Sequence, residues 1–457
     1  MIPMTLAEIA EATGGTLADG ADPASLVTGD LSFNSKTVSS GGLFCCLPGK
    51  HADGHDYAQQ AVEGGAAAAL ATRPVGIPAV LVGNVLTAMA DVARAVAHRY
   101  TGTVIAITGS AGKTSTKDML RQVLAEDGPT VATPKSYNNE IGFPTTVSQV
   151  RQDSRYLVLE MGARGKGHID ELCKIAPPRI ATVLGVGSAH IGEFGSREAI
   201  ADAKAEIVRA LPAHGVAVLN GDDPLVAAMR ADTDAQVITF GTGMDCDVRA
   251  RGVKIDEEGR PSFSLRYGPK VVRVQLAVHG RHNVTNALAA AATAFAAGVP
   301  FGRIATALQR AQLTSGGRMD VHRHGRLTLI NDSFNASPES MEAALEALQD
   351  VAGGRRMVAV LGEMAELGDE AAAWHDRIGR QVAKAGVLQV VTVGGKFADA
   401  LGEAARCVSS EVSVARAGDA QEALEMVRGL IKPGDTVLVK GANALNLGVV
   451  AEALLNS

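Results

Sequence analysis

The sequence predicts a three-domain α/β protein with a mostly parallel central sheet, and three observations support this fold class. The chain has 457 residues, whereas single hydrophobic cores stop growing at roughly 250–300 residues. Hydrophobic residues make up 46% of it and charged residues 20%, as in globular proteins. Short apolar runs alternate with amphipathic windows through most of the chain. Such alternation is typical of parallel sheets that are covered by helices.

The first predicted domain, residues 1–100, is a compact α/β unit. Strand-like runs at 43–47 and 79–82 are separated by Gly-rich turns, and a helical window covers 88–98. We expect its boundary near residues 100–102, because a series of apolar strands begins just beyond them.

The second predicted domain, residues 101–314, contains the parallel sheet. Continuous apolar runs predict buried strands, which we expect at 104–108, 156–161, 180–184, 216–219 and 237–240. Residues 248–278 instead alternate between apolar and polar and contain charged turns. This change of pattern predicts a small antiparallel addition to the sheet.

The third predicted domain, residues 315–457, is a Rossmann-like α/β unit. It follows the turn sequence TSGG at 314–317. We expect its strands at 327–330, 357–361, 390–393 and 436–439, with helical windows such as 338–348 between them.

Composition excludes several classes of protein. The net charge is -6 and no basic stripe of the kind that binds nucleic acid is present. The five cysteines lack the spacing of a zinc site or a disulfide framework. The first residues of the sequence lack a basic stretch followed by an apolar one, so we expect no secretory leader, and no run reaches 18 apolar residues. We therefore expect a cytoplasmic protein without a membrane span and without a nucleic-acid partner.

A phosphate-binding loop is predicted in the run IAITGSAGKTST at 105–116, which passes from a buried strand to a helix start. The run departs from the GxxxxGK[ST] pattern, because Ile107 stands five residues before Gly112. Even so, helix N-termini bind anions, and Lys113 and Thr114 are the residue types that contact phosphates and Mg²⁺. The alternative is a Gly/Ser turn with a surface lysine, which the flanking strand and helix disfavour.

Eight segments in sequence order give the chain a near end-to-end resemblance to the Mur ligases, a family related to folylpolyglutamate synthases. The segments are MIPMTLAEIAEATGG, TGSAGKTSTKDML, SYNNEIGFPTTV, EMGARGKGHIDEL, GVGSAHIGEFGSREAIADAKAEI, GRHNVTNALAAAA, INDSFNASPESMEAAL and LGEMAELG. The resemblance implies an N-terminal UDP-substrate domain, a central P-loop ATPase domain and a C-terminal Rossmann-like domain. It also implies a monomer.

The resemblance implies an ATP-dependent amide ligase. NDSFNASPESM is most similar to members that add D-Ala-D-Ala to UDP-N-acetylmuramoyl-tripeptide and so complete the peptidoglycan pentapeptide precursor. In that reaction the tripeptide carboxylate attacks the γ-phosphate to give an acyl phosphate and ADP, and the dipeptide amine then displaces phosphate. Because two anions meet in the first step, charge neutralisation is the main catalytic demand.

For the central domain the resemblance implies a nucleotide and metal site. The ATP phosphates would lie on Gly109, Ser110, Ala111, Gly112, Lys113, Thr114 and Ser115. Thr114 and Glu160 would hold one Mg²⁺, and His190 would hold a second together with a carbamate formed from CO₂ on Lys204. A carbamate supplies oxygen ligands, which Mg²⁺ prefers.

Other ATP contacts are implied on both sides of the cleft between the second and third domains. Asn139 would contact the γ-phosphate and the metal shell, while Asn283 and Asn286 would read the adenine. From the third domain Arg318 and Asp332 would close onto ATP, with Asp332 on the ribose. Domain closure is therefore the expected conformational step.

Substrate contacts are implied in the first and third domains. Those of the first domain are Ser32, Asn34, Ser35 and Lys36. Asn335 and Ser337 would lie near the incoming dipeptide. The family usually has Asp-Ser-Arg where this chain has Asn-Ser-Lys, and Asn where it has Ser337. Lysine does not reproduce the bidentate fork of arginine.

Two alternatives to this function stay open at the sequence level. The departures at the substrate segments fit a related ligase that joins another carboxylate and amine. A nucleotide-binding regulator without ligase activity is the second, although such a protein would be free to lose Lys113, Glu160, His190 or Lys204. Singly, Glu160, His190 and Lys204 also fit a strand end, a loop and a helix surface exposed to solvent. Only their occurrence together with the phosphate loop favours a catalytic site.

Overall fold

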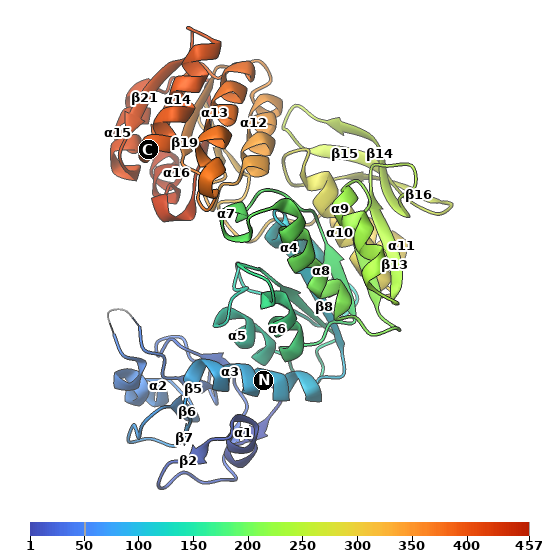
Figure 1. The fold of residues 1–457 in the computed structure, drawn as a ribbon, viewed down its shortest axis with the longest axis vertical. Coiled ribbons are helices and arrows are strands. Elements are labelled where there is room, and N and C mark those ends of the chain that lie inside the picture. The colour runs from blue at the N-terminus through green and yellow to red at the C-terminus, as the bar shows by residue number, and fades with distance from the viewer. Residues whose placement is uncertain (50–51, 457) are drawn as a thin grey trace.

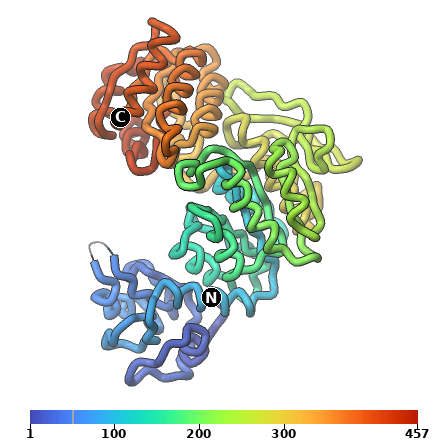
Figure 2. The backbone as a smooth tube through the Cα atoms, in the orientation of Figure 1, coloured from blue at the N-terminus to red at the C-terminus, as the bar shows by residue number. Residues whose placement is uncertain are grey.

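The structure is a computed structural model that describes residues 1–49 and 52–456. Figures 1 and 2 show the chain running from an N-terminal lobe, through a central one, to a C-terminal lobe at the opposite end. Each lobe has its own sheet, so the predicted three-domain α/β fold is confirmed. The limits 1–100, 101–314 and 315–457 remain our proposal. Among the described residues, no helix is both long and apolar enough to cross a membrane.

The N-terminal lobe has a five-stranded sheet in the order β2-β7-β6-β5-β4, beside a two-stranded pair β1-β3. Its strands are β1 (Met4–Thr5), β2 (Thr16–Leu17), β3 (Leu26–Val27), β4 (Leu31–Ser32), β5 (Leu43–Cys45), β6 (Ala68–Ala71) and β7 (Ala79–Leu81). Its helices are α1 (Leu6–Thr13), η1 (Gly54–Tyr57), α2 (Ala58–Glu63) and α3 (Val85–Arg99). Thr5 begins α1 with a capping box to Glu8. α3 packs against α1 and also against α5 and α6 of the central lobe, so it joins the two lobes.

The central lobe has a nine-stranded sheet in the order β16-β15-β14-β13-β12-β11-β8-β10-β9. Its parallel strands are β8 (Thr103–Thr108), β9 (Thr130–Ala132), β10 (Tyr156–Glu160), β11 (Ile180–Val183), β12 (Val216–Asn220) and β13 (Gln236–Gly241). β14 (Val248–Ile255), β15 (Pro261–Tyr267) and β16 (Lys270–Gln275) pair antiparallel with one another. The antiparallel addition predicted at 248–278 is therefore confirmed.

The helices of the central lobe cover both faces of this sheet, as Figure 1 shows. They are α4 (Lys113–Ala125), α5 (Gly142–Ser148), α6 (His168–Ile175), α7 (Ile191–Phe194), α8 (Arg197–Arg209), α9 (Pro224–Ala228), η2 (Met229–Asp232), α10 (Asn283–Ala296) and α11 (Phe301–Leu308). α10 packs on α4 through buried alanines and leucines, which places the alanine-rich segment behind the phosphate loop.

The C-terminal lobe has a six-stranded sheet in the order β17-β18-β22-β19-β20-β21. The strands are β17 (Asp320–His324), β18 (Leu327–Asn331), β19 (Met357–Gly362), β20 (Gln389–Val393), β21 (Ser413–Ala417) and β22 (Thr436–Lys440). The helices are α12 (Pro338–Ala352), η3 (Gly368–Glu370), α13 (Ala371–Lys384), α14 (Lys396–Val408), α15 (Ala420–Leu430), η4 (Asn443–Leu445) and α16 (Gly448–Leu455). The antiparallel edge strand β17 was not predicted, because its polar, exposed sequence DVHRH lacks an apolar run.

A buried histidine of this lobe allows a stability prediction. In α13 the Nε2 atom of His375 accepts the Met364 N–H (2.9 Å), and its Nδ1 lies 2.7 Å from the Ala371 carbonyl oxygen. Burial lowers the pKa of His375 below its usual 6.5. Between that value and the lowered one, the unfolded chain binds a proton that the folded chain does not, so stability falls as pH falls.

We expect the stability advantage of wild type over His375→Gln, measured by urea unfolding, to shrink between about pH 7.5 and about pH 5. The comparison with the variant isolates His375 from the other histidines of the chain. An advantage that is independent of pH would contradict this prediction.

Candidate active site

A cavity of about 1140 Å³ lies between the central and C-terminal lobes. β10, β8 and β11 are neighbours in the central sheet and run parallel, so their carboxyl ends meet at one edge. Each strand is followed by a segment that lines the cavity. In parallel α/β sheets this edge is where ligands bind. The cavity is therefore the candidate active site.

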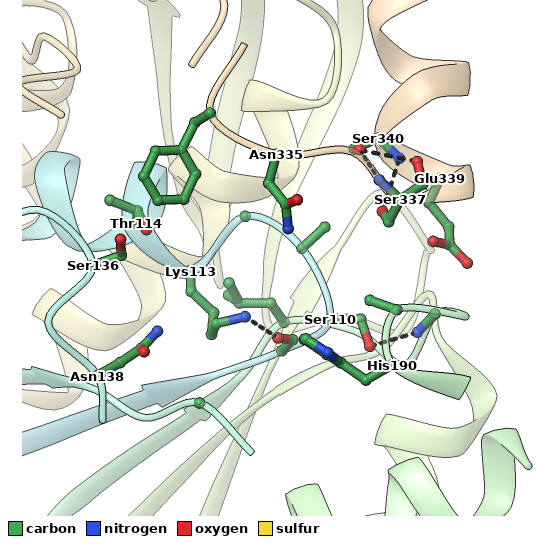
Figure 3. A pocket seen from close by; sticks show the side chains of 18 of the residues that line it. Ser110, Lys113, Thr114, Ser136, Asn138, His190, Asn335, Ser337, Glu339 and Ser340 are labelled. Atoms are coloured by element: carbon green, nitrogen blue, oxygen red, sulfur yellow. Dashed lines mark hydrogen bonds between the residues drawn. The ribbon is translucent and has the colours of Figure 1, made fainter. Parts of the chain in front are cut away.

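The phosphate loop forms the floor of the cavity. Gly112, just before α4, has a φ of 80°, and a Cβ there would lie 2.3 Å from the Oδ1 atom of Asn286, so this position requires glycine. Lys113 begins α4, and its Nζ donates to the Gly109 carbonyl oxygen (2.7 Å). Burial lowers the pKa of Lys113, and the Arg318 charge does so further. Figure 3 shows Lys113, His190 and Asn335 converging on one space.

Glu160 ends β10 with a side chain that is 1% exposed. Its two carboxylate oxygens accept from the Thr114 hydroxyl (2.8 Å) and from the Asn138 Nδ2 (2.7 Å). A hydroxyl and a carboxylate are the oxygen ligands with which Mg²⁺ sites are built, and waters and substrate phosphates complete them. Within residues 1–49 and 52–456 no cluster of three His, Cys, Asp or Glu side chains could hold a metal by itself. The donor set thus fits a Mg²⁺ shared with phosphate.

The amide that contacts Glu160 is not the one chosen from the sequence. Asn139 lines the cavity, but its Oδ1 accepts the Gly142 N–H (2.9 Å) at the start of α5. The adjacent Asn138 makes the contact with Glu160. Two consecutive asparagines in one loop cannot be distinguished without the backbone conformation, so the γ-phosphate role of Asn139 stays a prediction.

His190 and Lys204 both line the cavity. His190 has a φ of 64°, a conformation that costs energy outside glycine and is typical of functional sites, and its Nδ1 pairs with Glu366 of the C-terminal lobe. Burial lowers the pKa of His190, and the charges of Lys113 and Lys204 contribute. Lys204 is 6% exposed. Burial and the Lys113 charge lower the pKa of Lys204 to about 7.

The C-terminal lobe contributes an unpaired arginine. Arg318 lies 4.0 Å over the Phe334 ring, and its Nε is buried without a hydrogen-bond partner among the described residues. Burial lowers the pKa of Arg318. A desolvated guanidinium with an unused donor is suited to an anionic ligand.

Lys440 is a site residue that sequence reasoning missed. It ends β22 and is 2% exposed, and its Nζ donates to the Asp332 carboxylate (2.6 Å) and to the Asn335 carbonyl oxygen (2.9 Å). The other carboxylate oxygen of Asp332 accepts the Met319 N–H (3.0 Å). Asp332 therefore organises its own loop in this structure, and its ribose contact stays a prediction. The sequence signal for Lys440 was limited to a lysine at the end of a buried strand.

The two asparagines predicted to contact adenine, Asn283 and Asn286, differ in their access to the cavity. Asn283 is 0% exposed and does not line the cavity. Its Nδ2 donates to the His279 carbonyl oxygen (2.7 Å), and its Oδ1 accepts from Asn286 (2.8 Å). Both hydrogen-bonding groups of the Asn283 side chain are therefore bonded within the chain in this structure, and its adenine contact stays a prediction. Asn286 does line the cavity, beneath Gly112.

The predicted substrate residues divide between two places. Asn335 and Ser337 line the cavity, and Ser337 also caps α12. Those of the N-terminal lobe do not line it; they are Ser32, Asn34, Ser35 and Lys36. There the Asn34 Oδ1 accepts the Lys36 N–H (3.0 Å). An aspartate oxygen makes the same turn, so Asn34 replaces the family's aspartate without loss of this local structure.

Three family models match successive parts of the chain. They are the Mur ligase family catalytic domain over residues 30–101, the Mur ligase middle domain over 107–294 and the Mur ligase glutamate ligase domain over 317–443. Together they include the phosphate loop, Glu160, His190, Lys204 and Arg318.

Full-length relatives and solved structures agree. The UDP-N-acetylmuramoyl-tripeptide–D-alanyl-D-alanine ligase of Mycobacterium bovis is 45% identical, over 100% of this chain and 98% of its own. MurF from Acinetobacter baumannii has a TM-score of 0.88 at 31% identity, covering 100% and 99%. MurF from Thermotoga maritima in complex with ADP has a TM-score of 0.79 at 29% identity, covering 94% and 98%.

The fold and the cavity define a three-domain α/β enzyme with a phosphate loop at a domain interface. The relatives make that class specific, and this chain belongs to the Mur ligase family.

Proposed function

We propose that this protein is an ATP-dependent ligase that adds D-Ala-D-Ala to UDP-N-acetylmuramoyl-tripeptide. The reaction gives the pentapeptide precursor, ADP and phosphate through an acyl phosphate. The observation that carries the proposal is a cavity in which three cationic side chains form no ion pair with a described residue. None of the ion pairs among the described residues involves Lys113, Lys204 or Arg318, although all three line the cavity. Negatively charged substrates would neutralise them.

ATP binding follows from the same arrangement. The phosphate loop and the first residues of α4 line the cavity, and the N–H groups of a helix N-terminus would hold the phosphates. Lys113 would exchange the Gly109 carbonyl oxygen for a γ-phosphate oxygen, and Arg318 would bring its unused donor from the C-terminal lobe. The solved MurF from Thermotoga maritima is a complex with ADP, which supports nucleotide binding by this chain.

Two Mg²⁺ ions and a lysine carbamate belong to the proposal. Thr114 and Glu160 would hold the first ion, and His190 and carbamylated Lys204 the second. Bound Mg²⁺ would neutralise phosphate charge and align the reacting oxygens. Lys204 has the environment that carbamate formation requires, because a pKa of about 7 leaves much of the amine uncharged at neutral pH.

The chemistry proceeds in two steps. The tripeptide carboxylate attacks the γ-phosphorus, the bond to the β-phosphate oxygen breaks, and Lys113 and Arg318 stabilise the charge that is shared between the two anions. The uncharged dipeptide amine then attacks the acyl carbon, the bond from that carbon to the phosphate oxygen breaks, phosphate leaves and the nitrogen gives up one of its two protons. Asn335 and Ser337, which line the cavity on the α12 side, would hold the dipeptide.

Substrate dependence is the direct test of this function. We expect phosphate release from ATP by the purified protein only when both the UDP-muramoyl tripeptide and D-Ala-D-Ala are present, with a product whose mass is that of the pentapeptide. Each substrate is omitted in turn as the control. Release with another acid or amine, but not with this pair, would instead support a diverted ligase, and ATP binding without any release would support a regulator.

Assembly and location are also proposals. The cavity is lined by residues of the central and C-terminal lobes of one chain, and we propose that the protein works as a monomer. A cytoplasmic location is consistent with soluble, UDP-linked substrates.

A further inference from the structure

α4, the helix that follows the phosphate loop, contains a buried ion pair that the chemistry above does not use. The side chains of Lys117 and Asp118 are 2% and 1% exposed, and the Lys117 Nζ lies 3.0 Å from the Asp118 Oδ1. Neither residue lines the cavity. Removing both charges from water is costly and is offset only where each finds further polar partners. Those partners lie in two separate segments, each of which leads within a few residues into a wall of the active site.

Lys117 is hydrogen-bonded to the segment that leads to Asn138 in the cavity wall. Its Nζ donates to the carbonyl oxygens of Thr133 (2.7 Å) and Lys135 (2.8 Å). Lys135 has a φ of 50°, a left-handed conformation that residues other than glycine adopt at a cost. Three residues later Asn138 donates to Glu160. Lys117 therefore stabilises the turn that directs Asn138 at the proposed metal ligand.

Asp118 holds the linker to the C-terminal lobe. Its Oδ2 accepts the backbone N–H groups of Thr314 and Ser315, both at 2.9 Å, and its Oδ1 accepts from the Ser315 hydroxyl (3.3 Å). One helical turn further along α4, the Gln122 side chain both donates to the Gln312 carbonyl oxygen (2.6 Å) and accepts the Gln312 N–H (3.1 Å). α4 thus ties down the linker over residues 312–315.

The hydrogen bonds between α4 and the linker end just before the linker reaches the active site. Gly316 is exposed, and Gly317 has a φ of 71°. Arg318 follows at once, with its unused Nε at the cavity. Ser315 is the last residue that α4 holds, and two glycines separate it from Arg318; the second of them, Gly317, already donates its N–H to Asp320 of the C-terminal lobe (2.6 Å). The position of Arg318 relative to the phosphate loop is therefore set through α4.

We propose that Lys117 and Asp118 form a positioning pair for ATP: Lys117 orients the Asn138 wall, Asp118 sets the approach of Arg318, and the C-terminal lobe pivots at Gly316–Gly317. This inference rests on the proposed function, because it assigns ATP to the cavity. Both residues act through others and touch no substrate.

The test is a double-mutant cycle on ATP affinity, measured by calorimetry in the absence of the other substrates. We expect Asp118→Ala to weaken ATP binding about tenfold, and Asp118→Asn to weaken it less, because an amide oxygen still accepts the linker N–H groups. In an Arg318→Ala background, Asp118→Ala is expected to add less than a twofold loss, because the residue that it positions is already missing. If Asp118→Ala weakens ATP binding by the same factor with and without the Arg318 side chain, the inference is overturned.

The matched control is Asp435→Ala in the C-terminal lobe. Asp435 is 2% exposed, accepts the Lys432 N–H (2.7 Å) and pairs with Arg356 (2.6 Å), away from the cavity. Asp435→Ala is expected to lower the thermal midpoint of unfolding and to leave the affinity for ATP unchanged. An equal loss of affinity in Asp435→Ala would overturn the inference.

Two further outcomes separate the claims. If Asp118→Ala does not fold, Asp118→Asn and Gln122→Ala carry the same cycle, with smaller expected losses that should again disappear in the Arg318→Ala background. A wild-type protein that does not bind ATP contradicts the proposed function itself. A wild type that binds ATP, together with Asp118 variants that bind it equally well, contradicts only the positioning pair.

Discussion

Lys113→Met is expected to lower the rate of phosphate release about 10³-fold, the order seen when a preorganised charge stabiliser is removed. Among the residues that the structure describes, the Lys113 Nζ is bonded only to the Gly109 carbonyl oxygen, and Lys113 lies at the N-terminus of α4, where phosphate would bind. Methionine keeps the length and apolar stem of the side chain but removes the charge that the two reacting anions need. The measurement is the rate at saturating ATP, tripeptide and dipeptide.

The same variant is expected to be at least as stable as wild type. Burial lowers the pKa of Lys113, which means that the folded chain disfavours its charge. The thermal midpoint of Lys113→Met should therefore equal or exceed that of wild type, as expected where activity and stability oppose each other. Lys174→Met is the control, because Lys174 is exposed and pairs with Asp170 on the surface of α6. Lys113→Met protein that keeps wild-type turnover would contradict the role of the loop lysine.

Lys204→Ala is expected to lower turnover about 10²- to 10³-fold, and added formate or acetate should restore part of it. Lys204 is buried beside Lys113 and His190, and its pKa of about 7 leaves an uncharged amine that can attack CO₂. The new N–C bond and the loss of one proton convert this uncharged amine into a carbamate anion, which supplies oxygen ligands. A free carboxylate that enters the space left by alanine would supply the same oxygens.

Depletion of CO₂ offers a second readout of the carbamate. Wild-type turnover should fall in CO₂-free buffer and recover on addition of bicarbonate, whereas Lys204→Ala should respond to neither. Lys166→Ala is the control on the same side of the lobe, because Lys166 is 78% exposed and pairs with Asp202 of α8. Turnover of Lys204→Ala equal to that of wild type would rule the carbamate out as a required ligand.

Local sequence predicted those parts of the site that follow directly from one strand or helix. The phosphate loop depends on an apolar strand, two glycines and a Lys-Thr pair within a dozen residues, and the structure places it between β8 and α4. Glu160 ends β10 and the segment before His190 follows β11, and both strands run parallel to β8, which lies between them; the carboxyl ends of parallel strands meet at one sheet edge, so this meeting was predictable.

Contacts between distant segments were not predictable from spacing. Asn138 rather than Asn139 contacts Glu160, because one residue in an irregular loop changes the direction of a side chain. The Asn283 side chain is already hydrogen-bonded to the His279 carbonyl oxygen and to Asn286. It does not reach the cavity, because its face of α10 is buried in the central lobe. Lys440 and Glu366 reach the site from the C-terminal lobe, and no local pattern marks such partners.

The order of residues was thus enough for the α/β class, the run of three domains, the phosphate loop and the family, because each depends on short-range periodicity or on motifs that are contiguous in the chain. Which side chains meet in the cavity, which amides are already bonded and how α4 holds the linker to Arg318 were decided by tertiary structure. Those features depend on the docking of lobes whose contacting residues lie up to about 200 positions apart, as Asp118 and Ser315 do.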